Sequence, residues 1–170
     1  VVAVIDSGIN YHQEDLAAVM ATGSYACEVG TGTVGCDFVD AGDNNPMDVY
    51  GHGTHVAGII GSKGNNTLGV TGVCHGSKIL AVRVLNAAGS GTTSDIIQAV
   101  NFAAGTGLGK GNAKVINMSL GGGSYDFLFY DAIETARNNG VVVVVAAGNS
   151  GSDHTYFPSL PCDYFNDNII

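Results

Sequence analysis

Positively charged residues are scarce in this sequence: six Lys and Arg stand against fifteen Asp and Glu, which gives a formal net charge of −9. A negative surface repels phosphate backbones and anionic lipids, so we expect no nucleic-acid partner. Long hydrophobic runs are missing too, because no apolar stretch approaches the ~20 residues that a helix needs to cross a bilayer. The run VVVVVAA at 141–147 is short and β-branched, which is typical of a buried strand. We therefore expect no membrane span.

Linkers, internal repeats and low-complexity tracts are likewise absent, so residues 1–170 are predicted to form a single domain. With 45% hydrophobic residues, the chain can bury a substantial core. It opens inside the apolar run VVAVI without an initiator methionine or a signal peptide, and it closes on the strand-like NII. We therefore expect a domain that is incomplete at both ends.

Four cysteines are compatible with an oxidising compartment. Cys27 and Cys36 bracket the segment EVGTGTVG, which contains Gly and Thr, and we predict a disulfide that closes this loop. Two alternatives stay open for Cys74 and Cys162. Either they are small buried hydrophobic residues, or they pair with each other or with a cysteine elsewhere in the protein.

Val- and Ile-rich runs alternate along the chain with segments of helical periodicity. The runs are VVAVI (1–5), KILAVRVL (78–85), KVINMSL (114–120) and VVVVVAA (141–147). Helical patterns follow the second and third runs, in TTSDIIQAVNFAAG (92–105) and SYDFLFYDAIETARNNG (124–140). Strands that are apolar on both faces and are joined by helices predict a parallel sheet covered on two sides.

Ligands of open α/β sheets gather beyond the carboxyl ends of the strands. Asp6 follows the first run and Asn149 follows the fourth, while GHGTHVAG (51–58) reads as a helix start that can bring His52 to the same rim. In acyl transfer, a carboxylate orients an imidazole base and an amide donates to the oxyanion. Asp6, His52 and Asn149 fit these three roles.

The blocks VIDSGIN, GHGTHVAG, NMSLGGG and VVAAGNSG occur in this order and resemble the subtilisin-like serine proteases. The resemblance spans the full 170 residues and implies an α/β three-layer sandwich with a mainly parallel, doubly wound sheet. It also implies a secreted endopeptidase with an Asp-His-Ser triad, whose acid falls on Asp6, base on His52 and oxyanion amide on Asn149. We expect a monomer that acts on protein or peptide substrates.

The nucleophile serine of this family has no counterpart in the sequence. It belongs to a Gly-Thr-Ser-Met-Ala-like block downstream of the Gly-Asn block, and no such block occurs between Ser150 and Ile170. The similar GTTSD at 91–95 opens a predicted helix and lacks small residues after its serine. We therefore expect the first part of a longer protease, inactive on its own. The alternative is a serine-less relative that binds peptides without cleaving them.

Substrate binding is predicted for two glycine-containing segments. A peptide that binds as an extra strand needs exposed backbone N–H and C=O groups beside small side chains. GSG (89–91) and SLGG (119–122) meet this demand, and the resemblance places them on either side of the peptide. The residues just before Asn149 are expected to form one wall of the pocket for the substrate side chain next to the scissile bond. Asp48 could help to shape the same pocket. The predicted residues are Gly89, Ser90, Gly91, Ser119, Leu120, Gly121, Ala146 and Gly148.

The segment GNNTLGVTG (64–72) resembles the calcium loop of the same family. The Asn66 amide and the Leu68 and Val70 carbonyls match its ligand positions, and Asp15 matches its carboxylate. Oxygen donors of these kinds suit Ca²⁺, so the resemblance implies a structural calcium ion. The alternative is a surface turn rich in Asn and Gly.

The remaining histidines can be considered as metal ligands. His55 lies one helical turn after His52, and we expect it to be buried and hydrogen-bonded. Two imidazoles one turn apart can share a zinc ion, which would make the protein a zinc hydrolase. HGTH disfavours this, because the metalloprotease motif has a wider spacing and an intervening glutamate. His12, His75 and His154 show no ligand-like spacing and are expected on solvated loops.

Overall fold

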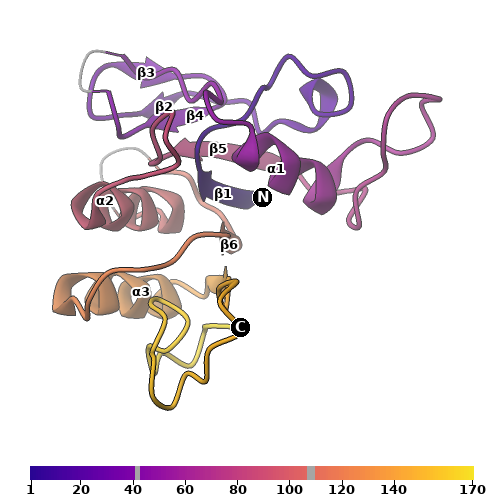
Figure 1. Ribbon diagram of the computed structural model, residues 1–170. Helices are drawn as coiled ribbons and strands as arrows, with labels where there is room; N and C mark the ends of the chain where they lie inside the picture. The colour runs from indigo at the N-terminus through magenta and orange to yellow at the C-terminus, as the bar shows by residue number, and fades with distance from the viewer. Residues whose placement is uncertain (41–42, 107–109) are drawn as a thin grey trace.

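A five-stranded parallel sheet forms the centre of the protein in a computed structural model that describes residues 1–40, 43–106 and 110–170 (Figure 1). Its order is β4–β5–β1–β6–β7. The strands are β1 (Val2–Asp6), β4 (Gly35–Asp37), β5 (Ile79–Arg83), β6 (Val115–Met118) and β7 (Val142–Val145). The short strands β2 (Tyr25–Ala26) and β3 (Thr31–Gly32) form a separate antiparallel pair.

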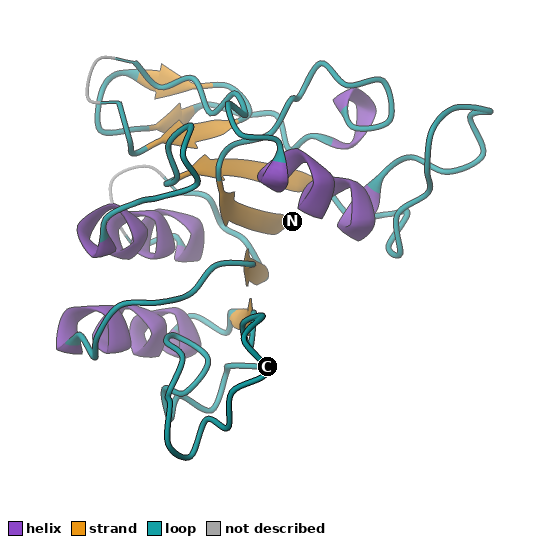
Figure 2. Cartoon of the chain, viewed as in Figure 1, coloured by secondary structure: helices purple, strands orange, loops and turns teal. Residues whose placement is uncertain are grey.

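The helices cover both faces of this sheet. They are α1 (His52–Gly61), α2 (Thr93–Ala104) and α3 (Phe127–Asn138), with a short 3-10 turn, η1 (Ala17–Val19). Figure 2 shows α1 on one face and α2 with α3 on the other. The chain passes from β1 through α1 to β5, and α2 then carries it back past β1 to β6. The predicted three-layer, doubly wound α/β fold is thereby confirmed.

Alternate side chains of the central strands supply two separate cores. On β1, Ala3 and Ile5 pack toward α2 and α3, whereas Val4 packs in the cluster that contains Ala57 of α1. These four side chains have no exposed surface. Because neighbouring residues of a strand point to opposite faces, a strand buried on both sides must be apolar at every position. This requirement explains the unbroken apolar runs of the sequence.

Strand β4 was not predicted, because its residues do not form an apolar run. It contains Asp37, which is 2% exposed and pairs with Arg83 of β5 at 2.6 Å. Burial raises the pKa of Asp37, although Arg83 and backbone hydrogen bonds oppose that shift. The buried Asp37 carboxylate is stable only because Arg83 pairs with it. Since Arg83 lies 46 residues away in the sequence, the local pattern does not reveal the strand.

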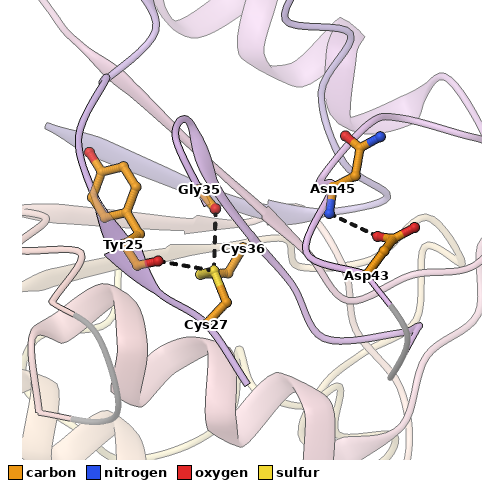
Figure 3. Close-up of a disulfide and its surroundings, with 6 residues drawn as sticks. All are labelled: Tyr25, Cys27, Gly35, Cys36, Asp43 and Asn45. Atoms are coloured by element: carbon orange, nitrogen blue, oxygen red, sulfur yellow. Dashed lines mark hydrogen bonds between the residues drawn. A yellow bond between two sulfur atoms is a disulfide. The ribbon is translucent and has the colours of Figure 1, made fainter. Parts of the chain in front are cut away.

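The predicted disulfide between Cys27 and Cys36 is confirmed, and it ties the loop after β2 to β4 (Figure 3). The carbonyl oxygens of Tyr25 and Gly35 lie 3.4 and 3.5 Å from the Cys27 sulfur. The other two cysteines form no disulfide. Cys74 is exposed and Cys162 is partly exposed, so neither a fully buried position nor a bond between them is found.

Within the described ranges of the chain, no helix is both long enough and apolar enough to cross a bilayer.

Replacing Phe102 by alanine should destabilise the protein strongly. Phe102 is 1% exposed, and its ring contacts Tyr25 and Phe38 at centroid distances of 6.0 and 5.8 Å. The cavity left behind should lower the free energy of unfolding of the full-length protein by about 3–5 kcal/mol in chemical denaturation. Phe165→Ala is the matched control, because that side chain is 92% exposed and its loss should cost less than about 0.5 kcal/mol. Equal losses of unfolding free energy in the two variants would contradict the burial of Phe102 in the core.

Candidate active site

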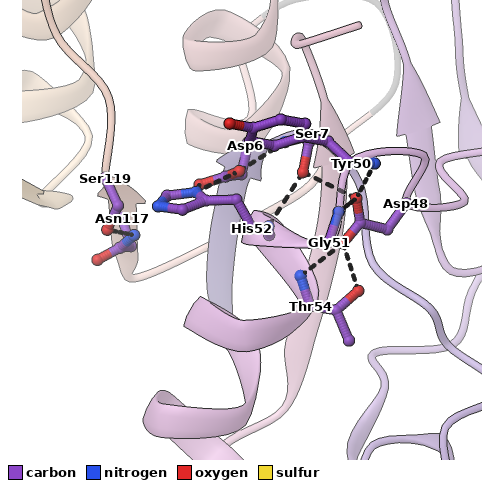
Figure 4. A network of polar contacts seen from close by, with 10 residues as sticks. Asp6, Ser7, Asp48, Tyr50, Gly51, His52, Thr54, Asn117 and Ser119 are labelled. Atoms are coloured by element: carbon purple, nitrogen blue, oxygen red, sulfur yellow. Dashed lines mark hydrogen bonds and ion pairs between the residues drawn. The ribbon is translucent and has the colours of Figure 1, made fainter. Parts of the chain in front are cut away.

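Asp6 and His52 meet at the carboxyl end of β1, as predicted (Figure 4). The His52 Nδ1 atom lies 2.9 Å from each carboxylate oxygen of Asp6. The Asp6 side chain is fully buried, whereas 41% of the His52 side chain is exposed. The carboxylate therefore fixes the tautomer with hydrogen on Nδ1 and leaves Nε2 as a proton acceptor.

A glycine allows α1 to approach the end of β1 closely enough for this contact. A Cβ atom on Gly53 would lie 2.1 Å from the carbonyl oxygen of Gly8 and 3.1 Å from the Asp6 Cβ. Any larger residue would push the helix away from the strand. The glycine that follows His52 in the motif therefore sets the distance between the imidazole and the carboxylate.

Asp48 ties the start of α1 to the segment after β1, a role that sequence reasoning missed. Its carboxylate accepts hydrogen bonds from the Ser7 hydroxyl at 2.8 Å and from both the backbone N–H and the hydroxyl of Thr54. The N–H groups of Tyr50 and Gly51 also donate to it. Burial raises the pKa of Asp48, but these hydrogen bonds outweigh burial and lower it overall. The only sequence signal was a carboxylate four residues before a helix start.

Most of the predicted substrate-binding residues line one cleft with His52. The cleft has a volume of about 540 Å³, and its lining includes both Gly89–Gly91 and Ser119–Gly121. The backbone groups of Ser119, Leu120 and Gly121 form no hydrogen bond with other described residues. They are therefore free to pair with an extended chain. Sequence reasoning missed several apolar residues of the lining, namely Leu85, Ile96, Phe129 and Leu160.

Asn149 lines the same cleft, while the residues before it do not. Its side chain is exposed and makes no hydrogen bond to another described residue, so its amide group is free to donate. Ala146 is half-buried and its N–H bonds the Met118 carbonyl at 3.2 Å, whereas Gly148 is exposed. The structure thus places Asn149, but not Ala146 or Gly148, on the cleft surface.

Neither serine near the imidazole is arranged as a nucleophile. Ser7 donates its hydroxyl hydrogen to Asp48 and accepts a hydrogen bond from the Gly53 N–H. Ser119 accepts one from the Asn117 amide at 3.0 Å. No described hydroxyl lies within hydrogen-bonding distance of the His52 Nε2 atom.

The expectation that His55 is buried is wrong, because its side chain is exposed. The buried face of α1 consists of Gly53, Ala57, Gly58 and Gly61. At about 100° per residue, a side chain two positions after Gly53 points to the opposite side of the helix. Among the described residues, His52 and His55 also belong to no group of three side chains that could hold a metal ion.

The residues of the predicted calcium loop do come together around Asp15, which is 1% exposed. The Asn66 amide nitrogen donates to one carboxylate oxygen at 2.7 Å, and the Val70 N–H donates to the other at 2.9 Å. These hydrogen bonds, the one from Asn66 foremost, lower the pKa of Asp15. The Leu68 N–H donates to the side-chain amide oxygen of Asn66, Oδ1, at 3.2 Å. Turning the amide over would present its oxygen beside the carboxylate, so the donor set is compatible with Ca²⁺.

Comparison with known proteins identifies relatives of this chain. A family model described as "Subtilase family" matches residues 1–166. A thermophilic serine proteinase of Bacillus sp. (strain AK1) is 44% identical over 158 residues, which cover 93% of this chain and 35% of that protein. Thermitase of Thermoactinomyces vulgaris is 39% identical over 165 residues, which cover 97% of this chain and 52% of that protein.

The fold has a solved counterpart. The crystal structure of a cold adapted subtilisin-like serine proteinase matches with a TM-score of 0.72 and 36% identity, covering 95% of this chain and 50% of that one. The chain thus spans about a third to a half of the length of these relatives. Other relatives are named as an extracellular protease and a cell wall-associated protease.

Replacing Asp48 by asparagine should destabilise the protein in a pH-dependent way. Because folding lowers the pKa of this carboxyl below its ordinary 3.8, its stabilising effect is present above that value and is lost as the pH falls through the lower folded-state pKa. Asp48→Asn should therefore lower the free energy of unfolding by about 1–3 kcal/mol near pH 7, and by much less near pH 2. The exposed Asp131→Asn is the control and should change little at either pH. An equal loss of unfolding free energy at both pH values would contradict the role of an ionised Asp48 carboxylate as hydrogen-bond acceptor.

Proposed function

The chain belongs to the subtilase family, and from this premise we propose that it carries the acid, the base and the oxyanion donor of a serine endopeptidase. The contact between Asp6 and His52 Nδ1 at 2.9 Å carries the proposal. Two of the relatives are named as serine proteinases and are longer than this chain, so we place the nucleophile serine outside these 170 residues. The 170 residues alone are then inactive.

In this proposal the His52 Nε2 atom removes the proton from the serine hydroxyl as the hydroxyl oxygen attacks the peptide carbonyl. The buried Asp6 carboxylate stabilises the positive charge that forms on the imidazole, and it costs no reorganisation because it already faces Nδ1. The imidazolium then donates its proton to the leaving amine. The exposure of His52 to the cleft supports both transfers.

The cleft supports binding of the substrate as an extended strand. The free backbone groups of Ser119–Gly121 pair with the peptide on one side, with Gly89–Gly91 on the other. The Asn149 amide donates to the oxyanion that forms beside His52. We also infer that Ala146 and Gly148 limit the adjacent side-chain pocket through their small size.

The cellular setting follows from the same premise. We propose a secreted protein that acts on proteins or peptides as a monomer. The disulfide between Cys27 and Cys36 supports an oxidising compartment, as do the relatives named for extracellular and cell-wall locations.

The two histidines of α1 offer a matched test in the full-length protein. His52→Ala should lower kcat for a peptide substrate at least about 10³-fold with little change in KM, because the base is lost while the cleft is intact. His55→Ala should keep activity within about twofold, because that side chain is exposed and does not line the cleft. The wild type should also be inactivated by a serine-directed fluorophosphonate. An active His52→Ala variant, or a wild type that is insensitive to the reagent, would exclude this mechanism.

We further propose that Asp15, Asn66 and the Leu68 and Val70 carbonyls bind a structural Ca²⁺ ion. A bound ion stabilises the folded state in proportion to RT ln(1 + [Ca²⁺]/Kd), so Ca²⁺ should raise the Tm of the full-length protein and a chelator should lower it. Asp15→Asn should abolish most of this difference, whereas the exposed Glu28→Gln should retain it. A Tm that is equal in Ca²⁺ and chelator, or a shift that survives in Asp15→Asn, would rule out this site.

A further inference from the structure

A second cluster of chemically versatile side chains lies apart from the Asp6–His52 pair. His154, Cys162 and Asp163 each place one ligand atom within 4.8 Å of the others, and within the described ranges no other three His, Cys, Asp or Glu side chains do so. The His154 and Asp163 side chains are 28% and 25% exposed, and Cys162 is also partly buried. None of the three has a part in the proposed triad or in the calcium loop.

We propose that His154, Cys162 and Asp163 bind a divalent transition-metal ion of the zinc class. The His154 Nδ1 and Asp163 Oδ1 atoms are 3.0 Å apart. Two ligands at about 2.1 Å from a tetrahedral zinc ion lie about 3.4 Å from each other, so a small rotation admits the ion in place of the shared hydrogen. The Cys162 sulfur is the third ligand, and the partial exposure leaves the fourth position to water.

The combination of donors selects the metal. A thiolate and an imidazole favour Zn²⁺ and similar ions over Ca²⁺ and Mg²⁺, which prefer oxygen ligands. Zinc binding releases the thiol proton to solvent, because the thiolate is the ligand. A catalytic Cys-His-Asp relay is the alternative, and it would need His154 to lie between Cys162 and Asp163. The three ligand atoms instead lie close to one another, as the ligands of a single metal ion do.

The turn that holds Cys162 and Asp163 is already fixed by hydrogen bonds. The Asp163 N–H donates to the Ser159 carbonyl at 2.9 Å, and the Ser159 N–H donates back to the Asp163 carboxylate. The Tyr164 N–H donates to the Pro161 carbonyl at 3.1 Å. Two ligands are therefore held on a rigid turn, and His154 reaches them from the preceding loop. Such preorganisation reduces the entropy lost on metal binding.

This site lies directly behind one wall of the cleft. Leu160, Gly123 and Ser124 line both the cleft and a neighbouring cavity of about 830 Å³ that His154, Cys162 and Asp163 also line. The Gly122 N–H donates to the Leu160 carbonyl at 2.9 Å, which joins the cleft edge to this wall. A bound ion would therefore stiffen the wall against which the substrate lies. This last consequence rests on the proposed function, whereas metal binding itself does not.

Titration of the reduced full-length protein with Co²⁺, followed by competition with Zn²⁺, tests the site. Co²⁺ should give a saturable thiolate-to-metal charge-transfer band that Zn²⁺ abolishes. Loss of a residue that only hydrogen-bonds to a metal ligand lowers metal affinity about 10–100-fold. Loss of a ligand itself should cost more, so His154→Ala and Asp163→Asn should bind the metal more than about 100-fold more weakly. Cys162→Ser should lose the charge-transfer band. His75→Ala and Cys74→Ser are matched controls on an exposed loop and should bind like the wild type.

A band that survives in Cys162→Ser or disappears in Cys74→Ser would overturn the assignment, as would a wild type that shows no saturable band. Tm values measured with a chelator separate loss of binding from loss of folding, since the proposal requires metal-free variants to melt close to the metal-free wild type. Zn²⁺ binding by a protein without protease activity would leave the site standing and would refute the proposed function. Protease activity without any metal band would refute the metal site and would leave the proposed function standing.

Discussion

The buried carboxylate of Asp6 is the constraint on which the rest of the site depends. A charge with no exposed surface is stable only when hydrogen bonds replace its hydration, and Asp6 receives them from the Ser7 N–H and from His52. The imidazole can reach it only because Gly53 lets α1 touch the strand end and because Asp48 holds the first turn of the helix. Strand, helix and intervening loop therefore position the imidazole together.

The arrangement of the strands explains why this carboxylate pairs with the imidazole and not with the nearby guanidinium of Arg83. Asp6 pairs in register with Arg83 on β5, yet the guanidinium bonds to Asp37 at the end of β4 and to Asp40 just after it. The positive charge of Arg83 is thereby paired with other carboxylates. Because β1 lies between β5 and β6, at the point where the winding of the chain reverses, its carboxyl end opens into the cleft.

The sequence allowed prediction of those features that depend on neighbouring residues. Long apolar runs predicted four of the five sheet strands, and the residues around Asp6 and His52 predicted their meeting. What depends on distant partners was missed. β4 contains a buried carboxylate that Arg83 compensates, and the Asp48 network joins segments about 40 residues apart. His55 was misplaced because the buried face of α1 is made of Gly and Ala, whose weak hydrophobic signal does not reveal the face.

The loop from 149 to 165 shows the same limit most clearly, since it has no regular secondary structure for periodicity to reveal. Its course is set by Tyr164, which is 5% exposed, packs edge-on against Phe129 and Tyr130, and exchanges hydrogen bonds with the backbone of Asp126. Asp126 in turn caps α3. One tyrosine therefore joins the start of α3 to the loop that carries Leu160 into the cleft, so this wall of the cleft depends on a contact between residues 38 positions apart in the sequence.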